Sequence, residues 1–142
     1  MRYSLRPATS NDLDAMMAIG NEGIRPYVEE VRGWDEAEET RGFVEHFLPE
    51  LTSIIVVDGH DVGYLKTESH ADHVYIDGIY LAKAYRSSGL GTLLISRTIA
   101  DAHAKDKRVR LRVLKPNPAR RLYDRLGFCQ IDTDTIHISM EA

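Results

Sequence analysis

The sequence predicts one α/β (α+β) domain, residues 1–142, in which helices flank a mixed sheet of six to seven strands. Three observations lead to this fold class. Short runs are rich in β-branched residues, longer stretches carry apolar residues at helical spacing, and glycine- or aspartate-rich turns separate the two. The predicted order is one strand, two helices, three strands, a helix, a strand, a helix and two strands. This order indicates a sheet packed against helices.

The N-terminal third begins with a strand over residues 3–6 that Pro7 stops, followed by a helix that starts at a Thr9 or Ser10 cap. Turn-forming residues then break the chain into turns and a short helical piece: Gly23, Pro26 and Gly33. A further helix begins after Asp35 and ends at Pro49. We therefore expect helical structure with an interruption before residue 35.

The remaining strands are predicted over residues 53–57, 62–68, 74–81, 109–114, 128–131 and 136–140. Between them, one helix begins near Leu90. Another begins at Asn117, with Pro118 at its first position and Gly127 just past its end. Gly78 interrupts the apolar strand 74–81, which predicts a β-bulge there.

A glycine-rich loop lies between the strand that ends at Leu81 and the next helix: Arg86-Ser87-Ser88-Gly89-Leu90-Gly91-Thr92. Its glycines let the backbone approach a ligand closely, and the first amides of the helix have no helical partner. Such a helix start binds anions. A dinucleotide fingerprint would need Gly or Ala in place of Leu94, and a nucleotide-triphosphate loop would need Gly-Lys-Ser/Thr, so neither motif is present.

This loop resembles the pyrophosphate-binding motif of the GCN5-related N-acetyltransferases (GNAT), Gln/Arg-x-x-Gly-x-Gly/Ala. By itself it also fits a simple turn that caps a helix. A second stretch, residues 117–128, resembles the family's later motif, Asn-x-x-Ala-x-x-Leu-Tyr-x-x-x-Gly-Phe, at the family's separation. The resemblance implies a mostly antiparallel central sheet, about four flanking helices and acetyl-coenzyme A as the acetyl donor, without a metal.

The resemblance also implies how the coenzyme is held. The pantetheine arm would pair with the backbone near Ile79 and Leu81. The pyrophosphate would contact Arg86 and the residues of the loop that follow it: Ser87, Ser88, Gly89, Leu90, Gly91 and Thr92. Asn117 and Tyr123 of the second motif complete this set. The family often has a basic residue or Gln where Ser88 stands, so we expect the phosphates to depend more on Arg86 and the amides.

Tyr123 matches the family's acid position and would protonate the departing coenzyme A thiolate. The alternative is a buried tyrosine that packs beside Leu122 and Leu126. A backbone amide near residues 78–80, freed by the expected bulge, would stabilise the oxyanion of the tetrahedral intermediate.

Asp77 is our candidate base, because it is the only carboxylate inside strand 74–81. Alternation places it on one face with Tyr75, Ile79 and Leu81, opposite Val74, Ile76 and Tyr80. The alternatives for Asp77 are a structural hydrogen bond or simple attraction of a cationic substrate. Many GNAT relatives instead remove the amine proton through water chains.

The predicted acceptor is a primary amine of a small molecule or peptide, with Tyr27, Glu30, Trp34 and Asp77 as its binding residues. A solvated acidic helix end, with Trp34 packed on the core, fits the same residues. Two other functions stay open: a non-catalytic acyl-coenzyme A-binding module, and acetylation of a protein N-terminus or lysine.

The composition limits the classes of partner that the protein can have. The net charge of -4 argues against nucleic-acid binding and favours a cationic acceptor. The first residues lack an apolar signal core, no run approaches the ~20 apolar residues that span a bilayer, and the single cysteine, Cys129, allows no internal disulfide. We expect a cytoplasmic protein without membrane contact. Edge strands near the C-terminus make a homodimer plausible.

Overall fold

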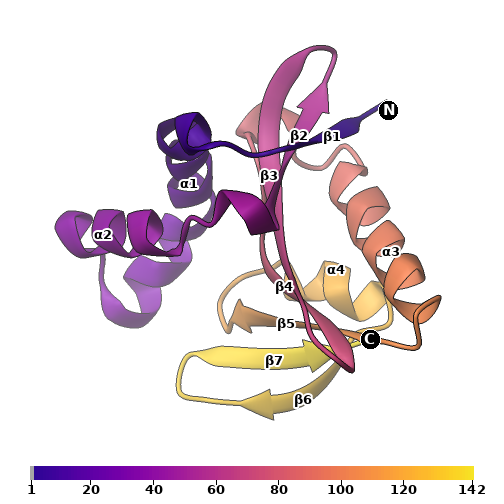
Figure 1. The fold of residues 1–142 in the computed structure, drawn as a ribbon. Helices are drawn as coiled ribbons and strands as arrows, with labels where there is room; N and C mark the ends of the chain where they lie inside the picture. The colour runs from indigo at the N-terminus through magenta and orange to yellow at the C-terminus, as the bar shows by residue number, and fades with distance from the viewer. Residues whose placement is uncertain (1) are drawn as a thin grey trace.

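The structure is a computed structural model that describes residues 2–142, and its core element is a seven-stranded sheet (Figure 1). The strands are β1 (Ser4–Pro7), β2 (Thr52–Val57), β3 (His60–Ser69), β4 (His73–Leu81), β5 (Arg108–Leu114), β6 (Cys129–Thr133) and β7 (His137–Glu141). The helices are α1 (Leu13–Arg32), α2 (Glu36–His46), α3 (Leu90–His103) and α4 (Arg120–Arg125), with 3₁₀ turns η1 (Ser10–Asp12), η2 (Pro49–Leu51) and η3 (Lys83–Tyr85). The predicted order of strands and helices is confirmed.

The sheet has the strand order β1-β2-β3-β4-β5-β7-β6, and every neighbouring pair is antiparallel except β4 and β5. A mixed, mostly antiparallel sheet is therefore confirmed. The parallel pair is short, because residues 73–76 of β4 meet residues 108–111 of β5 and the pairing stops there. Beyond this point the two strands run apart (Figure 1).

Helices cover both faces of the sheet, α1 and α2 on one side and α3 and α4 on the other (Figure 1). The α3 side holds two apolar clusters, in which Ile95 and Leu94 of α3 meet buried strand residues such as Val109 and Ile55. On the α1 side a smaller cluster joins Met16 to Tyr64 and Ile54. The central strands of the sheet thus have apolar clusters on both faces, as a sheet between helical layers requires.

Helix α1 is continuous over 20 residues, so the predicted break at Gly23 and Pro26 is wrong. Pro26 removes one helical hydrogen bond, but the helix buries residues on both sides of it, including Met16 and Val28. Gly33, with φ +77°, ends the helix as predicted. None of the helices in residues 2–142 is long and apolar enough to cross a bilayer.

Strand β4 carries the predicted bulge. Lys66 of β3 pairs with Gly78 and Thr67 pairs with Ile76, which leaves Asp77 as the extra residue. The bulge reverses the alternation of side chains beyond it. Ile79 and Leu81 pack on the α3 side, whereas Asp77 contacts Lys66 on the α1 side. Tyr80 also points to the α1 side, where its ring lies 5.5 Å from that of Tyr64. The predicted sharing of one face by Asp77, Ile79 and Leu81, opposite Tyr80, is therefore wrong.

Candidate active site

A cavity of about 1100 Å³ opens where β4 and β5 separate. Residues from all four helices, β4, the glycine-rich loop, β5 and β7 line it. Of the residues predicted for the site, its lining contains Tyr27, Asp77, Ile79, Leu81, Arg86, Ser87, Gly89, Gly91, Thr92, Asn117 and Tyr123. Four other predicted residues do not line it: Glu30, Trp34, Ser88 and Leu90.

The glycine-rich loop presents a run of unused amides to this cavity. Within residues 2–142, the backbone amides of residues 87–92 have no hydrogen-bond acceptor; the first amide that has one is that of Leu93, bonded to Gly89 O at 3.1 Å. Ser87 and Gly89 adopt positive φ values of 58° and 85°, which turn the chain into the start of α3. Leu90 is fully buried and anchors that helix start. Free amides at the positive end of a 14-residue helix are the kind of groups that bind anions.

Arg86 does not extend freely from this loop. Its Nε donates to Leu81 O at 3.0 Å and its Nη2 to Glu22 Oε1 at 3.4 Å, so it joins the end of β4 to α1. Ser88 Oγ donates to Tyr85 O at 2.7 Å, inside the turn. In this arrangement the amides, more than these two side chains, are available to a ligand.

The edge of β4 next to the loop is also open. In residues 2–142, no strand pairs with β4 on the β5 side beyond Ile76. The backbone near Ile79 can therefore accept hydrogen bonds from an extended ligand, as an added strand would. Across the cavity, α1 approaches at Gly23, where a Cβ atom would lie 3.1 Å from Tyr80 Cδ1. The glycine allows the helix to lie this close to β4.

Tyr123 projects from α4, and its ring packs edge-on against Phe128 at 5.7 Å. Burial raises the pKa of Tyr123 to about 12, so the phenol is neutral at physiological pH. Throughout residues 2–142, side-chain polar atoms that are fully buried all have a hydrogen-bond partner. The Tyr123 hydroxyl has no partner in the protein and so is not one of these fully buried atoms. The hydroxyl must therefore be accessible, and the accessible space beside it is the cavity. It is free to donate a hydrogen bond to a ligand.

Asp77 forms an ion pair with Lys66. The distance from Lys66 Nζ to Asp77 Oδ2 is 2.5 Å, and the same Nζ donates to His46 O, at the end of α2, at 3.0 Å. Lys66 is 8% exposed, whereas the Asp77 side chain is 35% exposed and lines the cavity. The pKa of Tyr80 is raised, mainly by burial and further by Tyr123 and Asp77. Asp77 thus faces the cavity as a charged group held by a nearly buried lysine.

The model of the acetyltransferase (GNAT) family matches residues 19–128. The chain belongs to this GNAT family. The match confirms the resemblance that the two sequence motifs indicated.

Solved structures share the fold of this GNAT chain. A PaiA N-acetyltransferase from Thermoplasma acidophilum, in complex with coenzyme A, is 19% identical with a TM-score of 0.79, covering 99% of this chain and 98% of that one. An N-acetyltransferase from Staphylococcus aureus is 14% identical, with a TM-score of 0.75 and coverage of 98% and 100%. An acetyltransferase from Thermus thermophilus is 14% identical, with a TM-score of 0.75, and the match covers 100% of this chain and 97% of that one.

Two predicted acceptor residues of this GNAT chain lie away from the cavity. Trp34 packs beneath Arg25, whose guanidinium carbon lies 5.1 Å from the ring centroid, and its indole N–H donates to Glu36 at 2.7 Å. Glu30 is exposed on α1. Trp34 therefore belongs to a small polar surface cluster.

Sequence reasoning missed several cavity residues on the acceptor side: Arg32, Glu39, Tyr75, Arg112 and His137. Arg32 and Glu39 form an ion pair of 2.6 Å between α1 and α2. A signal for Arg112 exists, because Leu111 and Val113 point into the core and alternation places Arg112 on the opposite face. No local signal marks Glu39 or His137, which reach the cavity through the packing of α2 and β7. In residues 2–142 no cluster of three or more His, Cys, Asp or Glu is arranged to hold a metal.

Proposed function

We propose that this GNAT chain is an N-acetyltransferase that moves the acetyl group of acetyl-coenzyme A directly to a primary amine. One observation carries the proposal: the unused amides of residues 87–92, the open edge of β4 and the Tyr123 hydroxyl all face one cavity. The complex of the Thermoplasma acidophilum relative with coenzyme A adds support.

In this proposal the pyrophosphate lies on the amides of residues 87–92, at the positive end of α3. The pantetheine arm runs along β4 beside Ile79 and Leu81, and Asn117 and Tyr123 line its far side. Asn117 Oδ1 accepts from the Ala119 amide at 2.9 Å, which fixes the turn that carries Tyr123 into the cavity. The thioester then lies near the bulge at Asp77, where β4 and β5 separate.

The amine must be neutral to attack the thioester, although a lysine-like amine has a pKa of about 10.4 in water. Asp77 attracts the ammonium group and accepts its proton, directly or through water. The attack forms a C–N bond and a tetrahedral oxyanion, which a backbone amide at the bulge stabilises. Collapse of this intermediate breaks the C–S bond and releases a thiolate.

Tyr123 acts on that thiolate. A phenol with a pKa of about 12 is a weaker acid than a thiol, whose pKa is about 8.5. Full transfer of the Tyr123 proton to sulfur is therefore uphill. We expect Tyr123 to stabilise the leaving sulfur by donating a hydrogen bond as charge develops, with the final proton supplied through solvent.

The test is release of coenzyme A from acetyl-coenzyme A across polyamines, amino acids, aminoglycosides and short peptides. Tyr123→Phe should lower kcat about 100-fold, the lower range for removal of one hydrogen-bond donor to charge that develops in the transition state, with little change in acetyl-coenzyme A affinity. Tyr3→Phe is the matched control, because Tyr3 does not line the cavity. Unchanged turnover would remove Tyr123 from the mechanism. Tight acetyl-coenzyme A binding without turnover on any amine would favour the non-catalytic binding module.

A further inference from the structure

The cavity is electrostatically unlike the whole chain, whose net charge is -4. Among residues 2–142, only two carboxylates line it, and both are already ion-paired: Glu39 with Arg32 at 2.6 Å and Asp77 with Lys66 at 2.5 Å. Four arginines line the same space: Arg32, Arg86, Arg112 and Arg125. All four are exposed to solvent at the rim of the cavity. Positive charge therefore exceeds negative charge in the lining.

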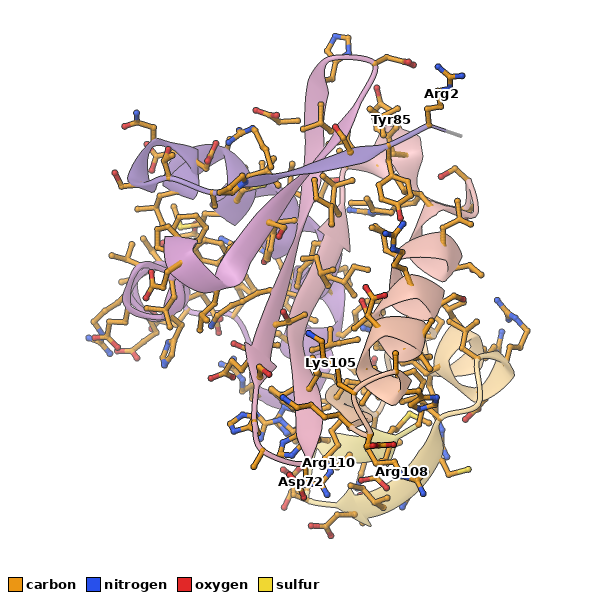
Figure 2. All side chains as sticks on the ribbon, turned by 45° about the vertical axis from the view of Figure 1, so that its right-hand side comes forward. Arg2, Asp72, Tyr85, Lys105, Arg108 and Arg110 are labelled. Carbon is orange, nitrogen blue, oxygen red and sulfur yellow. The ribbon has the colours of Figure 1, made fainter. Side chains whose placement is uncertain are left out.

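Arg112 is the uncompensated charge on the acceptor side. Within residues 2–142, no carboxylate lies within ion-pairing distance of its guanidinium. Two residues earlier on the same face of β5, Arg110 contacts Glu141 at 2.7 Å and Asp72 at 4.0 Å, and Figure 2 shows Arg110 beside Asp72. The register between β5 and β7 explains the difference. Glu141 is opposite Arg110, but Ser139 is opposite Arg112.

Arg112 also lies where the acceptor would bind. Leu111 and Val113 pack into the core on the α3 side, so Arg112 projects to the face that carries Asp77. Tyr75 lies near both charges. Burial raises the pKa of Tyr75, the charge of Arg112 opposes that rise and the charge of Asp77 adds to it. Arg112 and Asp77 therefore face a common space on the side of β4 away from α3.

We propose that the acceptor is an amine that also carries an anionic oxyacid group, in the first place a carboxylate, and that Arg112 binds this group. The inference rests on the proposed N-acetyltransferase function and names its substrate class. A guanidinium matches a carboxylate with two parallel hydrogen bonds. Asp77, on the same side of β4, attracts the ammonium end of the same molecule. An amino acid fits both requirements, with its carboxylate on Arg112 and its amine toward Asp77.

The first experiment compares each acid with a partner that keeps the amine and loses the anion. The pairs are alanine, methionine and phenylalanine with their carboxamides, measured by coenzyme A release at equal concentrations of neutral amine. Phosphoethanolamine and ethanolamine form a further pair that distinguishes a phosphate from a carboxylate. We expect kcat/KM to be at least about 10-fold higher for the carboxylates than for their amides.

The second experiment tests Arg112 itself. Arg112→Gln should lower kcat/KM for the acids by roughly 10- to 100-fold, the effect of losing a charged hydrogen bond, through KM and without a matching loss for the amides. Arg112→Lys should retain part of the activity. Arg108→Gln is the control, because Arg108 lies on the same strand (Figure 2) and is exposed like Arg112 but does not line the cavity. The inference would be overturned if Arg112→Gln lowered kcat/KM equally for acids and amides. It would also be overturned if the wild-type enzyme had the same kcat/KM for each acid and its amide.

A binding measurement separates this inference from the proposed function. If no amine is acetylated, the proposed function fails, and the same acids and amides are titrated calorimetrically into the protein saturated with coenzyme A. Binding that needs the carboxylate and is lost in Arg112→Gln would support the anion site without turnover. Equal binding of acids and amides, or no binding of either, would overturn it.

Discussion

The two halves of the cavity are built from different parts of the chain. The half proposed for the coenzyme consists mainly of backbone: the amides of residues 87–92 and the open edge of β4. The half proposed for the acceptor consists of charged side chains, such as Glu39, Asp77 and Arg112, from α2, β4 and β5. Every residue type except proline supplies a backbone N–H, whereas a charge requires a particular residue at a particular position.

This difference separates what the fold provides from what a particular sequence provides. The amides of the coenzyme half need only the turn at Ser87 and Gly89 and a buried anchor at Leu90. The charge balance of the acceptor half depends on single residues. Ser139, for example, is neutral, so no acid lies opposite Arg112 on β7. We therefore expect substitutions in the first half to act on coenzyme binding, and substitutions in the second to act on acceptor choice.

The largest expected effect comes from placing an acid in the coenzyme half. Thr92 is exposed at the start of α3 and lines the cavity. In Thr92→Glu the carboxylate would occupy the anion site and repel phosphate, so the Kd for coenzyme A should rise on the order of 100-fold in calorimetry. Stability should hold or increase by about 0.3–1 kcal/mol, because an acid suits a helix N-terminus.

Ser96→Glu makes the same change of charge one turn further along α3, at an exposed residue outside the cavity. It should leave coenzyme affinity unchanged. If Thr92→Glu also left the affinity unchanged, the amides would not be the phosphate site, and the contrast between the two halves would fail.

A smaller effect is expected from Asp77, where structural and chemical roles overlap. Asp77→Asn removes the negative charge beside Lys66, which is 8% exposed, and leaves its ammonium group with neutral acceptors such as the His46 carbonyl, so unfolding should become easier by about 1–3 kcal/mol. Turnover should fall roughly 10-fold below the pKa of the amine, where proton removal is needed, and recover at higher pH.

The double variant Asp77→Asn with Lys66→Met separates these roles. Removing the lysine charge should restore stability in thermal unfolding, because no unpaired charge remains, but should not restore turnover. Full turnover of Asp77→Asn across the pH profile would mean that water chains, and not Asp77, remove the proton.

The sequence predicted the elements and the loop well, because both depend on neighbours along the chain. Gly89 and Tyr123 lie in contiguous motifs, and strand runs need only local patterns. Prediction failed where distant packing overrides local preference. Pro26 would end an isolated helix, yet α1 continues through it because residues beyond it, such as Val28, are buried.

The bulge in β4 shows what a local sequence pattern can predict and what it cannot. Gly78 correctly indicated the bulge, but simple alternation then placed Asp77 on the side of Ile79 and Leu81, since the pattern cannot say which residue is the extra one. For Arg112, too, the sequence pattern predicts only part of the arrangement. Alternation places it opposite the core, but only the register of β5 against β7 decides that Ser139, and not an acid, lies across from it.

The smallest expected effect sharpens the boundary of the acceptor half. Trp34 and Glu30 do not line the cavity, whereas Tyr27, on the same helix as Glu30, does. Trp34→Ala and Glu30→Gln should therefore change the acceptor KM by less than about 2-fold, within the range of surface contacts. Tyr27→Ala should raise it several-fold more. A changed acceptor profile in Trp34→Ala would extend the acceptor half to the end of α1, and would mean that the cluster of Trp34 with Arg25 and Glu36 rearranges when the amine binds.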